Sequence, residues 1–167
     1  MFRPEIQKTR NLIAMAIVTM LSIFWVANSI EYIPADNIEE KMIATKKMSE
    51  YIESINRISE TNSKNDMYDS GLIGEEYSEI TSIFDNSENS FLESKIACTH
   101  PNFAALIVNM FNEAELSKGD TIAVSMTGSL PGANIALFAA CEAFNITPVV
   151  ISSVASSAWG ANRESFT

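Results

Sequence analysis

The segment Leu12–Ile30 carries no charged residue, and its length and composition constrain the chain more than any other feature. Its nineteen residues would span roughly 28 Å as a helix, which is close to the hydrocarbon thickness of a bilayer. Apolar side chains occur on every face of that helix, unlike in an amphipathic helix at the surface of a soluble domain. We therefore predict a membrane-spanning helix at residues 12–30.

The charges on either side of this segment predict its orientation. Arg3, Lys8 and Arg10 precede it, whereas Glu31 and Asp36 follow it. Because Lys and Arg are retained on the cytoplasmic side of a membrane, residues 1–11 are expected in the cytoplasm and the rest of the chain outside it. The pattern is typical of a single-pass protein of the cell membrane.

Two other interpretations of the apolar segment remain open. A buried core helix would make the asymmetry of the flanking charges a coincidence. A cleaved signal peptide has an apolar region of about 7–15 residues before a small-x-small cleavage site. Here the apolar run is longer, and Ala27-Asn28-Ser29 is a weak cleavage sequence. We favour an uncleaved signal anchor over both.

The charge balance and the scarcity of His and Cys narrow the function classes. The whole chain has a net charge of −10, and residues 1–30 carry a net charge of +2. The exported part therefore has a net charge of −12. Such a surface repels nucleic acid and anionic lipid headgroups. One histidine, His100, and two cysteines, Cys98 and Cys141, are too few for a zinc site or a disulfide framework. We expect no metal and no cofactor, and a Cys98–Cys141 bond stays open.

Residues 31–70 are expected to form an amphipathic juxtamembrane helix, up to about Glu60, followed by a polar linker. Apolar residues recur in the helical part at steps of three to four. We expect this helix to pack on the domain that follows, because a coiled-coil stalk would need at least three clean heptads. Two later short segments, 77–84 and 91–97, are ambiguous.

Residues 71–167 are predicted to form an extracytoplasmic α/β domain. A helix is expected from Pro101 to a stop at Gly119, and strand, helix and strand are expected at 121–126, 131–145 and 147–153. The last three form a βαβ unit with parallel strands, as in Rossmann-like folds. Because parallel sheets need cover on both faces, this domain looks incomplete at its C-terminus, and we expect a longer protein.

Small, hydroxyl-bearing and glycine residues follow both predicted strands. Ligands bind beyond the carboxyl ends of strands in open α/β sheets, and a helix N-terminus attracts anions. We therefore predict a crevice suited to a carboxylate or a phosphate, with Arg163 as its positive charge. The alternative is that these residues serve only turns, caps and packing. The predicted ligand-binding residues are Thr127, Gly128, Ser129, Asn134, Ser152, Ser153, Ser156, Trp159, Asn162 and Arg163.

Known catalytic and nucleotide-binding motifs are missing from these loops. There is no GK[ST] ending of a P-loop and no G-x-G-x-x-G fingerprint. Ser129 lies on a strand-to-helix turn, but the G-x-S-x-G motif is absent and the sole histidine precedes another helix. Ser125 and Ser129 are therefore only weak nucleophile candidates, and no catalytic residue is assigned.

The chain resembles the poly-gamma-glutamate system protein family over about residues 70–167. The similar segments are Gly71-Leu72-Ile73-Gly74 followed by an acidic residue, Glu79-Ile80-Thr81, Pro101-Asn102-Phe103-Ala104-Ala105, Gly119-Asp120, Gly128-Ser129-Leu130-Pro131 with Asn134, and Ser152-Ser153 leading to Trp159-Gly160-Ala161-Asn162. The resemblance implies a membrane-anchored component of bacterial γ-linked polyglutamate synthesis and export. It also implies a chain that continues beyond Thr167, and it assigns no catalytic residues.

The combined expectation is an anchored, non-enzymatic accessory component that binds poly-γ-glutamate or another carboxylate and works with other membrane components of the same system. Two alternatives remain. The first is a hydrolase or transferase acting on an amide-linked polymer, for which no base is evident near Ser129. The second is a sensor of small anions. The sequence predicts neither the ligand nor the oligomeric state.

Overall fold

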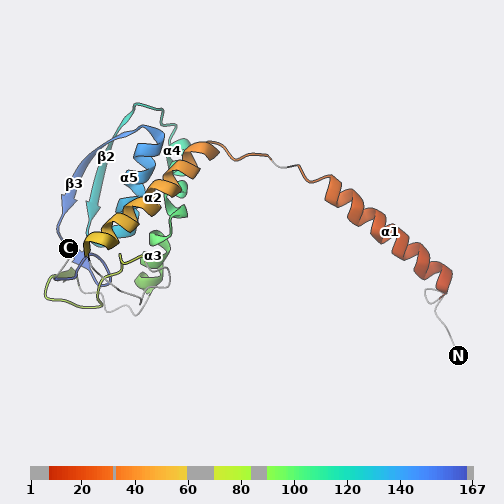
Figure 1. Cartoon of the computed structure of the whole chain (residues 1–167), viewed down its shortest axis with the longest axis horizontal. Helices are drawn as coiled ribbons and strands as arrows, with labels where there is room; N and C mark the ends of the chain where they lie inside the picture. Colours follow the sequence, from red (N-terminus) through yellow and green to blue (C-terminus); the bar gives the residue numbers. More distant parts are fainter. Residues whose placement is uncertain (1–7, 32, 60–69, 84–89, 165–167) are drawn as a thin grey trace. The chain divides into compact units, whose positions relative to one another are not determined.

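The computed structural model describes residues 8–31, 33–59, 70–83 and 90–164, without the side chains of 59, 82, 83, 90 and 91. The chain divides into two compact units, Met1–Ala35 and Asp36–Thr167 (Figure 1). The polar linker that we expected at 61–70 lies almost entirely outside the described residues.

The first unit contains one helix, α1 (Thr9–Asn28), which is long and apolar enough to cross a membrane by length and composition. The helix begins three residues before the start of the predicted segment and ends two residues before the end of that segment. Thr19 and Ser22 donate their hydroxyl hydrogens to the carbonyl oxygens of the residues four positions earlier, both at 2.9 Å. The polar side chains of an otherwise apolar helix are thereby satisfied within the helix itself.

The second unit combines helices with two small parallel sheets. Its elements are α2 (Ile38–Ser59), β1 (Thr81–Ile83), α3 (Ser90–Thr99), α4 (Asn102–Glu113), β2 (Thr121–Thr127), α5 (Pro131–Phe144), β3 (Thr147–Ser153) and β4 (Ser156–Ser157). Strands β2 and β3 pair in parallel over their whole length, and β1 pairs in parallel with β4. The predicted βαβ unit, β2–α5–β3, is confirmed. A complete Rossmann-like sheet is not found among the described elements.

Helix α5 lies at the centre of the core, between the β2–β3 sheet and helices α2 and α4 (Figure 1). Its alanines allow this close packing, and Ala136, Ala139 and Ala140 are completely buried. Phe111 of α4 meets Phe144 of α5 edge to face, with ring centroids 6.1 Å apart. Asn145 ends α5 in the left-handed conformation that stops many helices.

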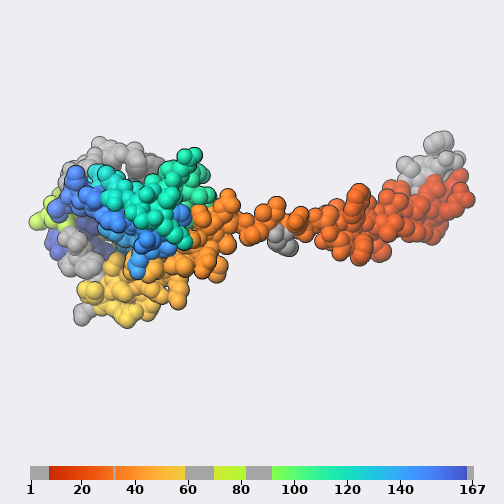
Figure 2. Space-filling model, turned by 90° about the horizontal axis from the view of Figure 1, so that it is seen from above, coloured from red at the N-terminus to blue at the C-terminus, as the bar shows by residue number. Residues whose placement is uncertain are grey.

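Helix α2 is part of this core. Its residues Ala44, Met48 and Ile52 are buried in the main apolar cluster, and Figure 2 shows the helix in orange to yellow against the rest of the unit. Its expected packing on the domain is therefore found. Polar contacts add to it: Asn37 to Asn112, Lys118 to Glu40, and both Lys47 and Tyr51 to Glu142.

Three local details concern predictions from the sequence: the end of α4, the role of Gly119 and the state of the two cysteines. Helix α4 ends at Glu113 rather than near Gly119, because Glu115 takes the left-handed conformation with φ 57°. Gly119, with φ +96°, instead forms the turn that precedes β2. Both cysteines are free thiols. Burial raises the pKa of Cys98, and it raises the pKa of Cys141 to about 11.

The β2–β3 sheet is covered on one face only by the described residues. Alternate side chains of both strands are half-buried beneath the helices, and those between them are exposed. On the open face Val149 is 57% exposed and Ile151 78%. Neither strand contains a charged residue.

Candidate functional site

The loops that follow β2 and β3 are hydrogen-bonded to each other at Gly128. The Gly128 N–H donates to the Ala155 carbonyl at 3.0 Å, and the Gly128 carbonyl accepts the Ala161 N–H at 2.7 Å. The Ser156 hydroxyl also donates to that carbonyl, at 3.2 Å. A Cβ at Gly128 would lie 3.3 Å from both Ala155 and Ser156, so a residue without a side chain fits this junction best.

Serine and threonine hydroxyls fix the first of these loops against the second. The Thr127 hydroxyl accepts the Ser129 N–H at 3.1 Å, and the Ser129 hydroxyl accepts the Ser157 N–H at 3.0 Å. The Asn134 amide, in the first turn of α5, donates to the Thr127 carbonyl at 2.7 Å. The carboxyl ends of β2 and β3 thus carry a small hydroxyl-rich platform beside the N-terminus of α5.

A buried lysine, Lys95 of α3, lies beneath this platform. Its side chain is only 4% exposed. Its Nζ donates to the Ser129 carbonyl at 2.6 Å and to the Ser157 hydroxyl at 2.7 Å. Lys95 forms no ion pair with any described residue, and burial alone lowers the pKa of its amine. The amine is therefore a buried group of potential positive charge whose partners among the described residues are neutral.

Sequence reasoning missed Lys95, although the chain contains a signal for it. The residues of α3 that face inward are spaced at three to four positions, from Leu92 through Lys95 to Thr99, and a lysine occupies the central position of that stripe. Burial of lysine is rare in proteins unless the amine has a partner. A lysine on the inward face of α3, between Leu92 and Thr99, was therefore the informative feature of the ambiguous segment 91–97.

Asn162 and Trp159 hold the chain segment that contains Glu75. Asn162 is completely buried, and its amide bonds to both the N–H and the carbonyl of Glu75 and to the Thr81 hydroxyl, all at 2.8 Å. The backbone N–H of Trp159 donates to the Glu75 carbonyl at 2.7 Å, and the Trp159 carbonyl accepts the Gly74 N–H at 3.1 Å. Asn162 and Trp159, which we predicted to bind a ligand, therefore hold the loop after β3 against the segment around Glu75.

Arg163 and the exposed serines of β2 and β3 are predicted site residues that do not bond to Lys95. The Arg163 guanidinium donates to the carbonyls of Gly71 and Ile73, so it is bonded to neutral backbone groups of the same segment. Ser125, Ser152 and Ser153 are exposed residues of β2 and β3. No described hydrogen bond joins any of them to Lys95. The cation bonded to Ser129 and Ser157 is Lys95, whereas the described bonds of Arg163, the predicted cation, go to the Gly71 and Ile73 carbonyls.

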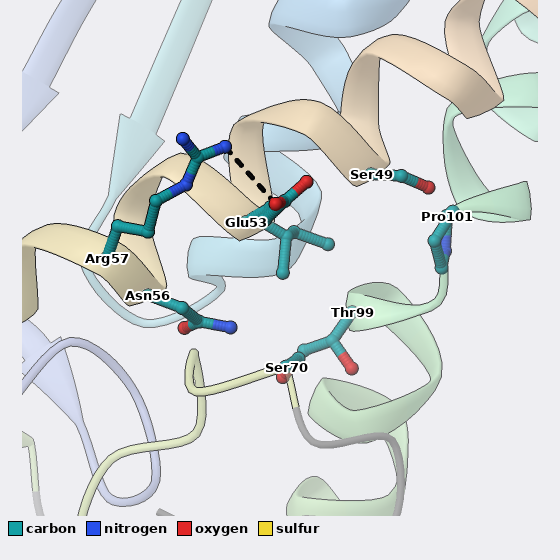
Figure 3. Close-up of a pocket in the computed structure, with 8 residues that line it drawn as sticks. Ser49, Glu53, Asn56, Arg57, Ser70, Thr99 and Pro101 are labelled. Carbon is teal, nitrogen blue, oxygen red and sulfur yellow. Dashed lines mark ion pairs between the residues drawn. The ribbon is translucent and has the colours of Figure 1, made fainter. Parts of the chain in front are cut away.

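A separate cavity of about 380 Å³ lies between α2 and the junction of α3 with α4 (Figure 3). At its edge Arg57 and Glu53 form an ion pair at 3.2 Å, with both side chains mostly exposed. Its lining residues are Ser49, Ile52, Glu53, Asn56, Arg57, Ser70, Thr99 and Pro101, and none of them belongs to the predicted site.

Among the described residues, no three or more His, Cys, Asp or Glu side chains are grouped so as to hold a metal ion. Comparison of the chain with protein-family models, with curated proteins and with solved structures finds no match. The site is therefore defined by its own chemistry, which is a buried amine, two loop hydroxyls and a helix N-terminus at one edge of a parallel sheet.

Proposed function

We propose that this protein is a membrane-anchored accessory component of poly-γ-glutamate synthesis or export, whose folded unit holds a carboxylate of the polymer at the Lys95 platform. The observation that supports it best is the environment of Lys95. An ammonium group in a site of this burial is costly unless an anion compensates it. A lysine ammonium has three donors, and the described residues accept only two.

A carboxylate is the anion that matches the surroundings of this amine. The hydroxyls of Ser129 and Ser157 lie within the same hydrogen-bonded group, and both residues are half-buried rather than sealed from solvent. Helix α5 begins two residues after Ser129, so the positive end of its dipole adds to the attraction. Every residue of a γ-linked glutamate polymer carries one free carboxylate, and the resemblance of residues 70–167 to the polyglutamate family points to that polymer.

The proposed location is the outer side of the cell membrane, with α1 as the anchor. The basic residues before α1 and the net charge of −12 after residue 30 support this orientation. A strongly acidic domain repels a polyanion everywhere except at a local cation. Such a domain would hold the polymer briefly at one point and release it, as a component that passes the chain onward requires.

The test is the amount of γ-linked glutamate polymer, cell-bound and released, in a strain that lacks this gene. Loss of both pools would assign the protein to synthesis, and a shift between the pools would assign it to export or retention. Complementation should succeed with Lys46→Met, which changes an exposed lysine of α2, and fail with Lys95→Met. Unchanged pools in the deletion strain would contradict the proposal.

Binding distinguishes the polymer component from an anion sensor. Titration of the full chain in detergent micelles with a γ-linked glutamate oligomer should give a saturable signal that Lys95→Met removes. Saturable binding of glutarate or phosphate in a chain whose deletion leaves both polymer pools unchanged would instead favour a small-anion sensor.

A further inference from the structure

The contact between Lys95 and Ser157 has the geometry of an activated nucleophile. Nζ and Oγ are 2.7 Å apart, within the range over which a base takes a proton from a serine hydroxyl. Lysine acts as such a base when burial favours its neutral form and when no carboxylate holds the proton on the amine. Both conditions hold for Lys95, which is 4% exposed and has no ion pair among the described residues.

The hydrogen bonds of Lys95 fit a neutral amine as well as an ammonium group. A neutral amine has two N–H donors and one lone pair. One N–H can donate to the Ser129 carbonyl at 2.6 Å, while the lone pair accepts the Ser157 hydroxyl hydrogen at 2.7 Å. Loss of one proton therefore reverses the direction of a single hydrogen bond and breaks none.

Ser157 is held for reaction by the neighbouring loop. Its backbone N–H donates to the Ser129 hydroxyl at 3.0 Å, and the Ser129 carbonyl bonds Lys95. One residue thus positions both members of the pair. Ser157 is half-buried, whereas its neighbour Ser156 is 1% exposed and donates to the Gly128 carbonyl. Of these two adjacent serines, Ser157 is the one that contacts the amine and is partly exposed.

We propose that Ser157 and Lys95 form a serine–lysine dyad that transfers acyl groups from amide or ester substrates. This activity goes beyond the proposed function, which uses Lys95 as a charged ligand for a carboxylate. The dyad uses the same amine in its neutral form, while no carboxylate is bound to it. The choice of the γ-amide of polyglutamate as the natural acyl donor rests on the proposed function, but the dyad itself does not.

The reaction balances with water or an amine as the second substrate. Ser157 Oγ attacks the carbonyl carbon and forms a C–O bond, while its proton passes to the neutral Lys95 amine. The tetrahedral intermediate then collapses, the C–N bond breaks, and Lys95 returns the proton to the leaving nitrogen. Water or an acceptor amine next attacks the ester on Ser157. Its proton passes through Lys95 to Oγ as the C–Oγ bond breaks, which releases an acid or a new amide.

The experiment is covalent labelling of the full chain in detergent micelles with a fluorophosphonate, which reacts with activated serines, followed by intact mass and peptide mapping. We expect one label, on Ser157. Ser157→Ala should abolish it, and Lys95→Met should slow labelling by about 10²–10⁴-fold, the usual contribution of a general base. Ser54→Ala and Lys46→Met, which change exposed residues of α2, are the matched controls.

One further variant and a pH profile separate the dyad from a structural role for Lys95. Lys95→Arg keeps a positive charge that cannot serve as a base, so it should label as slowly as Lys95→Met even where its thermal unfolding matches the unchanged chain. The labelling rate of the unchanged chain should rise with pH through the pKa of Lys95, and this step should be absent from both variants. Labelling of Lys95→Arg at the unchanged rate would overturn the dyad.

The outcome for the dyad is distinguishable from that for the proposed function. Ser157→Ala retains the Lys95 amine, so it should still bind the glutamate oligomer while losing the label. No label on Ser157 in a folded chain that binds the oligomer refutes the dyad alone. A label on Ser157 in a chain that neither binds the oligomer nor affects the polymer refutes the proposed function and leaves an acyl transferase or hydrolase of another substrate.

Discussion

The side chain of Asn162 bonds both polar backbone groups of Glu75, accepting its N–H and donating to its carbonyl, each at 2.8 Å. A strand neighbour would make the same two bonds, so one buried amide here replaces a piece of sheet. The loop after β3 is thereby joined to a segment that precedes it by more than eighty residues. Ser157, five positions before Asn162, lies in the loop that this contact holds.

Asn162→Ala should destabilise the folded unit by about 3 kcal/mol, because it removes three hydrogen bonds of a completely buried side chain, although the Glu75 carbonyl keeps the Trp159 N–H. Denaturant unfolding of the chain measures the loss. Asn112→Ala, which removes only an exposed bond to Asn37, is the control and should cost less than about 1 kcal/mol. Equal costs for the two variants would show that Asn162 is not the main link.

Glycines at the site should tolerate alanine in a definite order. A Cβ at Gly132 would lie 2.7 Å from the Cys98 carbonyl oxygen and 2.9 Å from the Thr99 nitrogen, so α5 would have to move away from α3. A Cβ at Gly128 meets nothing closer than 3.3 Å. We expect Gly132→Ala to cost about 1–3 kcal/mol and Gly128→Ala less. Thermal unfolding of both variants tests this order, and the reverse order would contradict the packing of α3 on α5.

Glu142 should make stability depend on acid pH. The hydrogen bond from Lys47, and then that from Tyr51, lowers the pKa of its carboxyl, and the same contact raises the pKa of Tyr51 to about 12. A lowered folded-state pKa stabilises the fold above the ordinary glutamate pKa, and this contribution is lost as the pH falls through the folded value. Because the carboxylate is half exposed, Glu142→Gln should cost only about 0.5 kcal/mol at pH 7.

Comparison of Glu142→Gln with the unchanged chain at two pH values separates the effect of the Glu142 charge from an effect of packing. Unfolding by urea at pH 7 and at pH 3 should show a larger difference from the unchanged chain at the higher pH. Added salt should reduce that difference at pH 7, since an exposed pair is screened. A cost that is the same at both pH values would mean that Glu142 contributes through packing and not through its charge.

Lys95 should also make stability rise with pH, but in a more alkaline range than Glu142. Burial lowers its folded-state pKa, so the unfolded chain binds more protons and stability rises as the pH increases from the folded value towards the ordinary lysine value. Lys95→Met should remove this rise, which is measured as the difference in unfolding free energy between the two chains at pH 7 and pH 10. A difference that does not change with pH would place the amine in water.

The orientation of α1 is testable by fusion of alkaline phosphatase, which is active only outside the cytoplasm, after the folded unit. We expect an active fusion in the membrane fraction. Replacement of Arg3, Lys8 and Arg10 by glutamate should reduce this activity, because the basic residues retain the N-terminus inside. Release of the fusion into the medium would instead indicate a cleaved signal peptide.

The sequence predicted the elements whose apolar residues follow one regular period. The strand at 147–153 has its predicted bounds, the strand at 121–127 is longer by one residue, and α2 packs on the domain as expected. Periodicity did not predict α3, because two of the three residues on its inward face, Lys95 and Thr99, are polar. The predicted loops do lie together, but which hydroxyl meets an amine depends on the packing of α3 under the loops, a tertiary contact that no local pattern encodes.

The uncharged strands β2 and β3 have a consequence for the behaviour of the protein in solution. Strand edges without charged side chains are templates for pairing with another chain, and natural proteins usually block them with lysine, proline or a covering element. Neither strand has a lysine, and β3 has one proline, Pro148, near its start. Here the net charge of −12 after residue 30 keeps two copies apart by long-range repulsion. Since that repulsion weakens with ionic strength, the colloidal stability of the domain should be set by salt, with dispersed chains in dilute buffer and self-association in concentrated salt.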